Sequence, residues 1–260
     1  MWVERLARFG YATKGAVYGL IGILAVMAAF TAGGKTTDTK GALHTIAAQP
    51  HGQILLILVA VGLVGYVIWR FVQAIKDPDN KGSDAKGIAT RIGYVISGLI
   101  YASLAVNAVL IVIGASGGGG SSKQTWTARI LSQPFGQWLV GTIGAILIGV
   151  GLYRIYKAYR IKFRKKLDLR ELDYKKEKLV VNVCRFGITA RGVIFIMLGF
   201  FLIQAGRQSD ASEVQGLDGT LQIIARQPHG KFLLGLAAFG LIAYGIYMFV
   251  QARYRLIKTR

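Results

Sequence analysis

Residues 52–69 read GQILLILVAVGLVGYVIW, a run without a single charged side chain. An α-helix satisfies its backbone hydrogen bonds internally, so a helix of this composition can cross the hydrocarbon core of a membrane. Crossing takes about 20 residues at ~1.5 Å per residue, which this run and its flanks supply. No ten-residue alternation of apolar and polar residues suggests a β-barrel, so the run predicts a transmembrane helix.

Five similar runs occur elsewhere in the chain. The expected spans are 10–32, 52–75, 92–114, 135–157, 186–205 and 231–252. Across all 260 residues 53% are hydrophobic and 17% are charged, whereas a soluble protein carries about 25% charged residues. The fold class is therefore all-α, a polytopic membrane protein with six transmembrane helices.

The basic residues are distributed unevenly between the connections. The net charge is +20, and most Lys and Arg residues lie at the two chain ends, between spans two and three, and between spans four and five. By the positive-inside rule these segments are cytoplasmic, so both termini are expected on the cytoplasmic side of the plasma membrane. The charge favours contact with the lipid bilayer and with anionic lipid headgroups on the cytoplasmic face, and nucleic acid is not expected as a partner.

The sequence repeats itself three times. Arg8-Phe9-Gly10 returns as Arg91-Ile92-Gly93 and as Arg185-Phe186-Gly187. Each copy is followed, after 41 or 42 residues, by a Gln-Pro-x-Gly element that begins at 49, 133 and 227. We therefore divide the chain into repeat 1 (1–80), repeat 2 (86–160), a basic cytoplasmic insert (161–182) and repeat 3 (183–260). The first span matches the first span of each other repeat, so it is expected to be retained rather than cleaved as a signal peptide.

Each repeat contains two spans, so all three repeats point the same way through the membrane. Parallel repeats of this kind are related by an axis along the membrane normal. The expected architecture is a six-helix bundle with pseudo-threefold symmetry. Whether the axis is a pore or a packed seam is left open.

A stripe of small residues follows each repeat arginine at helical spacing. Small residues allow close helix packing in membranes. The stripe is expected to pack helices at Gly15, Gly19, Gly22, Gly98, Ala102, Ala105, Gly192 and Gly199. The Gln-Pro-x-Gly elements are expected at the start of the second span, with proline in its first turn and a short amphipathic helix just upstream.

These repeats resemble the bacterial membrane proteins catalogued as domain of unknown function 1206, whose unit is a two-helix hairpin often present in three copies. The resemblance rests on the Arg-x-Gly and Pro-x-Gly elements and covers the chain apart from the basic insert. Repeat 2 departs most, with Ser97 where its siblings have Lys14 and Arg191. The resemblance implies a fold and a membrane location, and no activity.

Basic side chains at the inner ends of the spans are the candidate binding residues. An anion or a lipid headgroup is expected at Arg8, Lys14, Arg70, Arg91, Arg154, Arg185 and Arg191. The alternative interpretation is snorkelling, in which long side chains cover apolar surface while the charge reaches the membrane interface.

No catalytic, metal or cofactor site is expected. The histidines His44, His51 and His229 lack a supporting carboxylate spacing, so we interpret them as turn or capping residues. The insert is expected to form an amphipathic surface helix or to extend the fourth span, and a protein partner or a homo-oligomer is left open.

The prediction is therefore an integral membrane protein that is not an enzyme. We expect a non-catalytic membrane subunit or scaffold that acts through its small-residue faces and basic surface. The alternative is a channel or carrier for a small anion along the pseudo-threefold axis.

Overall fold

The computed structural model describes residues 2–30, 36–115, 122–133, 135–208 and 214–257. Six long helices are long and apolar enough to cross a membrane, and they correspond to the six expected spans. The ends of the first expected span, at 31–32, lie outside the described residues. The long helices are α1 (Trp2–Phe30), α3 (Gly52–Ile75), α4 (Ala85–Val112), α6 (Gly136–Tyr159), α7 (Tyr174–Gln208) and α9 (Gly230–Tyr254).

Three short helices precede the second long helix of each repeat, as the sequence predicts. They are α2 (Thr39–Ala47), α5 (Ser122–Leu131) and α8 (Leu217–Arg226). Helix α2 begins where the Asp38 carboxylate accepts a hydrogen bond from the Gly41 N–H at 3.0 Å, an arrangement that caps the helix start.

The Gln-Pro-x-Gly elements form turns between helices. In the first repeat the Gly52 N–H donates to the Gln49 carbonyl at 2.8 Å, and the equivalent bonds in the other repeats measure 2.9 and 2.7 Å. The residue before each glycine has positive φ, with values of 61° at His51, 67° at Phe135 and 63° at His229, as the third position of a type II turn requires. The prediction that proline opens the second helix is therefore wrong for Pro50 and Pro228, because the helices begin two residues later; Pro134 lies outside the described residues.

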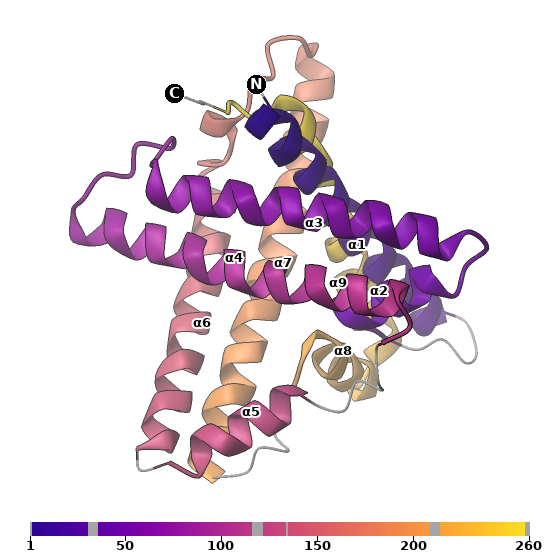
Figure 1. The fold of residues 1–260 in the computed structure, drawn as a ribbon, viewed down its shortest axis with the longest axis vertical. Helices are drawn as coiled ribbons and strands as arrows, with labels where there is room; N and C mark the ends of the chain where they lie inside the picture. Colours follow the sequence, from indigo (N-terminus) through magenta and orange to yellow (C-terminus); the bar gives the residue numbers. More distant parts are fainter. Residues whose placement is uncertain (1, 31–35, 116–121, 134, 209–213, 258–260) are drawn as a thin grey trace.

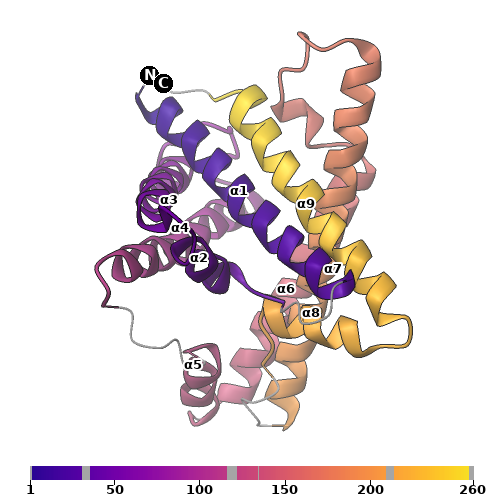
Figure 2. The ribbon, with the colours of Figure 1, turned by 90° about the vertical axis from the view of Figure 1, so that its right-hand side faces the viewer.

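The long helices form three pairs that join different repeats. Helix α1 lies along α9, α3 along α4, and α6 along α7, and these are the most extensive helix contacts in the structure. Figures 1 and 2 show the α3–α4 pair crossing the α6–α7 pair, and α1 beside α9. The second helix of each repeat thus packs on the first helix of the next, and α9 closes the cycle on α1.

The small-residue stripes lie at these contacts between repeats. A Cβ added at Gly15 would stand 2.9 Å from the Gly245 carbonyl oxygen of α9, and one at Gly192 would stand 2.9 Å from the Gly151 carbonyl oxygen of α6. Gly22 also faces α9, Gly199 faces α6, and Gly98 meets the Phe71 ring of α3 more loosely. Ala105 is buried and Ala102 is half-buried on α4. A Cβ at Gly19 would itself meet no atom within 4 Å, although the backbone of Gly19 lies under Gly245.

The chain ends and the connections rich in basic residues meet on one side of the molecule, which we call the basic side. The start of α1 and the end of α9 lie close together there (Figure 2). The Leu256 N–H donates to the Lys166 carbonyl at 3.0 Å and the Asp168 N–H to the Tyr254 carbonyl at 2.8 Å, so the tail pairs with the insert.

The insert differs from the prediction. After α6 ends at Tyr159 the chain makes a single 3-10 turn at Arg164–Lys166, and Phe163 and Leu169 are buried beside it. Helix α7 then begins at Tyr174, so the insert extends the fifth span and not the fourth. A separate surface helix does not form because the apolar side chains of the insert pack inward.

Candidate functional site

Four of the predicted basic residues converge inside the helix bundle. Lys14 comes from α1, Arg70 from α3, Arg154 from α6 and Arg191 from α7, and we call them the cation cluster. Arg70 and Arg154 occupy the same position of the second helix in two repeats, and Lys14 and Arg191 occupy the same position of the first helix. Equivalent positions of the repeats therefore bring these four side chains together, although they are distant in the sequence.

Lys14 is enclosed by tyrosines. Its side chain is 5% exposed, and its Nζ donates a hydrogen bond of 3.0 Å to the Tyr66 hydroxyl. The same Nζ lies 4.4 Å from the centre of the Tyr101 ring and 4.6 Å from that of Tyr66, within the range of cation–π attraction. Lys14 is buried among these rings instead of extending along the surface, so the snorkelling interpretation is wrong for this residue.

The three arginines also lie on aromatic faces. The Arg191 Cζ is 4.2 Å from the centre of the Tyr18 ring and 4.6 Å from that of Tyr244. The Arg154 Cζ is 4.9 Å from the centre of the Phe195 ring, and Arg191 also reaches this ring. Aromatic faces carry partial negative charge and stabilise these cations in place of carboxylates.

The Arg70 guanidinium lies 4.8 Å from the centre of the Tyr66 ring and donates a hydrogen bond to the Tyr66 hydroxyl. Tyr66 thus receives hydrogen bonds from both Arg70 and Lys14.

Aromatic side chains fill the point where the three repeats meet. Tyr18, Tyr101 and Phe195 occupy the same position of each repeat. The hydroxyls of Tyr18 and Tyr101 lie 3.5 Å apart, and Arg191 stacks on both Tyr18 and Phe195. Side chains of all three repeats are therefore in contact at this level.

The cluster has positive charge without a counterion. In the part of the chain that the structure describes, none of its four members forms an ion pair with a carboxylate. The Nε atoms of Arg70, Arg154 and Arg191 are buried and find no hydrogen-bond partner among the described residues. Buried charges are strongly unfavourable unless they are paired, so the four cations raise the free energy of the folded protein.

The remaining predicted cations lie elsewhere. The Arg8 Nη1 donates to the carbonyls of Ala252 at 2.8 Å and Arg253 at 2.6 Å at the end of α9, and its Nη2 pairs with Glu4 at 2.9 Å. Arg91 donates in the same way to the Ala74 carbonyl at the end of α3, at 2.6 Å. Both stabilise a helix C-terminus, where backbone carbonyls lack partners. Arg185 is half-buried on α7, six residues before Arg191.

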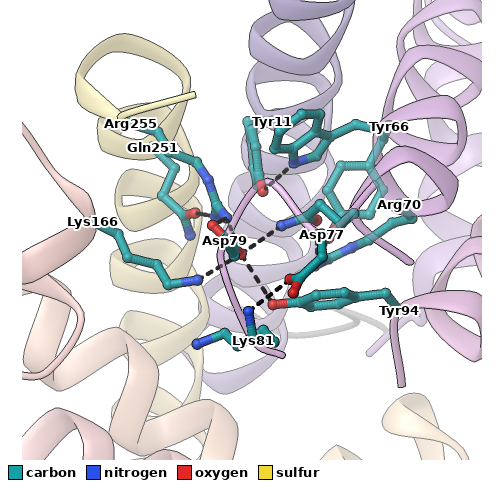
Figure 3. Close-up of polar contacts among 12 residues, drawn as sticks. Tyr11, Tyr66, Arg70, Asp77, Asp79, Lys81, Tyr94, Lys166, Gln251 and Arg255 are labelled. Atoms are coloured by element: carbon teal, nitrogen blue, oxygen red, sulfur yellow. Dashed lines mark hydrogen bonds and ion pairs between the residues drawn. The ribbon is translucent and has the colours of Figure 1, made fainter. Parts of the chain in front are cut away.

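A second polar centre, which sequence reasoning missed, lies on the basic side (Figure 3). The Asp79 Oδ2, in the loop between α3 and α4, accepts hydrogen bonds from Lys166 Nζ at 2.7 Å, Gln73 Nε2 at 2.9 Å and the Tyr94 hydroxyl at 3.1 Å, and it pairs with Arg255 Nη2 at 3.2 Å. We call these five residues the Asp79 junction. The loop, the insert and the tail meet there, so the junction ties the three repeats together.

The electrostatics of the junction favour the ionised carboxylate. Burial opposes ionisation of Asp79, but the charges of Arg255 and Lys166 hold its pKa well below the usual range. Burial and the Arg255 charge lower the pKa of Lys166 to about 8, while Asp79 opposes this shift. Nothing in the sequence pattern distinguishes Asp79 from an ordinary loop aspartate, because its partners come from distant segments.

The junction connects to the cation cluster through Arg70. The Arg70 Nη1 donates to Gln73 Oε1 at 2.9 Å, and the Arg70 Cζ lies 5.3 Å from the centre of the Tyr94 ring. Gln73 and Tyr94 both contact Asp79, so a continuous polar path runs from the cluster to the basic side.

The histidines give no metal centre. His51 and His229 lie at the starts of α3 and α9 in the turns described above, and His44 lies in the last turn of α2. Among the described residues no group of three or more His, Cys, Asp or Glu side chains could hold a metal ion.

Six membrane-spanning helices in three repeats define a class of multi-pass membrane protein with an internal threefold organisation. Residues 9–77, 92–160 and 186–255 each match the family described as Domain of Unknown Function (DUF1206), and the chain belongs to this family. The chain is 41% identical over 254 residues to the uncharacterized protein YxxB of Bacillus subtilis, a match that covers 98% of this chain and 92% of the relative. No solved structure matches the chain.

Proposed function

We propose that this protein binds an anionic group inside the membrane, at the cation cluster, and that it works by binding or carrying rather than by catalysis. The observation that supports the proposal is the set of four cations that lie against aromatic rings and pair with no carboxylate of the described residues. An anion placed beside the Nε–H groups of Arg70, Arg154 and Arg191 would accept charge-assisted hydrogen bonds. It would also offset the repulsion among the four cations.

The alternative of a scaffold that acts through small-residue faces has less support. Gly15, Gly98 and Gly192 already pack against neighbouring repeats, so these faces are not available to a partner protein. An open anion channel also has less support, because aromatic side chains fill the seam where the repeats meet. We therefore expect no chloride or potassium flux from liposomes that contain the protein above the flux from empty liposomes.

The proposal includes the orientation of the protein in the membrane. We place the basic side, with both termini, in the cytoplasm of a bacterial cell, since the positive-inside rule governs short connections of this kind. The Asp79 junction then lies on the cytoplasmic side of the cluster. A protease or a thiol reagent applied to intact cells should not reach a site introduced in the C-terminal tail.

The proposal is tested by thermal unfolding of the purified protein in neutral detergent at constant ionic strength. Inorganic phosphate, sulfate and phosphatidylglycerol are the probes, and a ligand at about 100 times its Kd stabilises a protein by ~2.7 kcal/mol. We expect at least one probe to raise Tm in the parent protein and not in Arg191→Gln, while Arg164→Gln, which alters an exposed arginine, responds like the parent. A Tm that no probe raises, or an equal response in Arg191→Gln, contradicts the proposal.

A further inference from the structure

The two long helices of repeat 2 do not pack on each other, unlike those of repeats 1 and 3. Helices α1 and α3 are in contact, as are α7 and α9, whereas α4 and α6 make almost no contact in the described part of the chain. In repeat 1, a Cβ added at Gly10 would stand 2.6 Å from the Tyr66 backbone nitrogen. In repeat 3, Gly187 lies directly against the backbone of Ala243 and Tyr244.

Repeat 2 keeps the glycines of this interface but leaves them open. Gly93 is the equivalent of Gly10 and Gly187, and Gly149 is the equivalent of Gly65, which packs on the Leu6 carbonyl of α1. A Cβ added at Gly93 or Gly149 would meet no atom within 4 Å. The faces of α4 and α6 that correspond to the α1–α3 and α7–α9 contacts are therefore uncovered.

Two isoleucines account for the separation. In repeat 1 Gly62 lies against Thr13, and in repeat 3 the equivalent Gly240 lies against Ala190. Repeat 2 has Ile96 and Ile146 at these two positions, and they are 53% and 58% exposed. Two branched side chains cannot replace a glycine and a small residue at backbone contact distance, so the sequence itself keeps α4 and α6 apart.

Gly93 and Ile96 of α4 and Ile146, Gly149 and Val150 of α6 are exposed, and we call the region between the two helices that they border the α4–α6 opening. Arg154 follows Val150 by one helical turn, so the two lie on the same face of α6. On α4, Tyr94 directly follows Gly93 and lies under the Arg70 guanidinium. Arg70, Arg154 and Arg191 are half-buried, whereas Lys14 is buried.

We infer that the α4–α6 opening is a lateral binding site for an anionic phospholipid, whose phosphate contacts Arg70, Arg154 and Arg191 while an acyl chain lies along Ile96, Ile146 and Val150. This inference rests on the proposed function, because it names the source of the bound anion. The opening combines an apolar wall with unpaired cations, and an amphiphile with one negative headgroup complements both. A second copy of the chain would bring apolar surface but no negative charge to the arginines.

Ile96 and Ile146, which keep α4 and α6 apart, allow a test with matched variants. The double variant Ile96→Thr with Ile146→Gly copies the pair found in repeat 1, and Ile96→Ala with Ile146→Gly copies the pair in repeat 3. Either variant should let α4 approach α6 without altering any member of the cation cluster. Native mass spectrometry then compares the binding of phosphatidylglycerol, phosphatidylcholine and glycerol 3-phosphate to the parent and the variants.

We expect the parent protein to retain one phosphatidylglycerol molecule more tightly than phosphatidylcholine or glycerol 3-phosphate, by tenfold or more. Both closing variants and Arg154→Gln should lose this preference, and Lys176→Gln, at an exposed position, should keep it. If one closing variant fails to fold, the other serves alone. Should both fail, Gly149→Leu, which fills the opening from a position with free space, takes their place.

The alternative outcomes separate the two proposals. Equal binding of glycerol 3-phosphate and phosphatidylglycerol, both lost in Arg154→Gln, keeps the anion site and overturns the lipid inference. Phosphatidylglycerol binding that persists in the closing variants also overturns the lipid inference. The same holds if the parent protein binds no lipid but forms a dimer that the closing variants abolish. Absence of every anion overturns the proposed function as well.

Discussion

The Nζ of Lys14 donates its hydrogen bond to the Tyr66 hydroxyl over 3.0 Å, joining α1 to α3 inside the bundle. Arg70 donates to the same hydroxyl, so one phenol oxygen serves two cations. An ammonium that is buried against a phenol hydroxyl and aromatic faces is expected to raise the free energy of the ligand-free fold.

We therefore expect Lys14→Met to stabilise the ligand-free protein. Methionine fills a similar volume and removes one of four mutually repelling charges, and replacing buried charges by apolar residues stabilises proteins by about 1–4 kcal/mol. Thermal unfolding in detergent without added anion measures the change. Lys176→Met, at an exposed position, controls for loss of charge. A lower Tm in Lys14→Met than in the parent would show that Lys14 is already satisfied by its tyrosines.

Asp79→Asn should separate the three segments that meet at the Asp79 junction. Breaking a buried ion pair by removing one partner costs about 3 kcal/mol. We expect a lower Tm and faster proteolysis of the C-terminal tail. Asp77 provides the control: its carboxylate accepts the backbone N–H groups of Lys81 and Gly82, at 2.7 and 2.8 Å, and lies outside the junction, so Asp77→Asn should affect the loop alone.

The contribution of Asp79 should depend on pH in one direction. Its pKa is lowered in the folded protein, so it stabilises the fold at any pH above the unfolded value of about 4. The stabilisation is lost as the pH falls below that value toward the folded pKa. The difference in Tm between the parent and Asp79→Asn should therefore be constant from pH 5 to about pH 7, before Lys166 begins to lose its proton, and should shrink below about pH 4. A difference that grows as the pH falls contradicts this assignment.

Two glycines of one helix test the packing of the repeats. A Cβ at Gly144 of α6 would stand 2.7 Å from the Gly199 carbonyl oxygen of α7, whereas a Cβ at Gly149 would meet nothing. We expect Gly144→Leu to destabilise the protein by about 3 kcal/mol through overpacking and Gly149→Leu to be tolerated. Equal destabilisation by the two substitutions would indicate that α6 packs in another way. The yield of monodisperse protein and its Tm are the readouts.

Arg8 and Arg91 should behave differently from the cation cluster. Each donates to carbonyls at the end of a neighbouring helix, so Arg8→Met and Arg91→Met should each cost about 1 kcal/mol through loss of these hydrogen bonds. Neither should change the response of Tm to phosphate or phosphatidylglycerol. An anion response lost in Arg91→Met would bring this residue back into the binding site.

The sequence predicts the helices and their repetition because the signals are local: apolar length, turn residues and recurring motifs. The short helices before Gly52 and Gly230 follow from the same reasoning. The pairing of Lys14 with Tyr66 could not be found from the sequence, since it depends on how α1 packs on α3 within repeat 1. The Asp79 junction depends on the path of the insert and tail, which carry no repeat.

The separation of α4 from α6 could have been read from the sequence by comparing aligned positions in pairs. Thr13 with Gly62 and Ala190 with Gly240 are each one small residue opposite a glycine, and Ile96 with Ile146 is not. The comparison requires knowing that these positions touch, which is a property of the folded repeat. The effect of Ile96 and Ile146 on the distance between α4 and α6 therefore becomes clear only in the folded protein.

The most direct measurement is a high-resolution cryo-electron microscopy map of the protein in nanodiscs that contain phosphatidylglycerol. The account predicts density for a phosphate within hydrogen-bonding distance of Arg154 and Arg191, with an acyl chain continuing between α4 and α6. A map at the same resolution in which the four cations lie together with no negative group among them would contradict it.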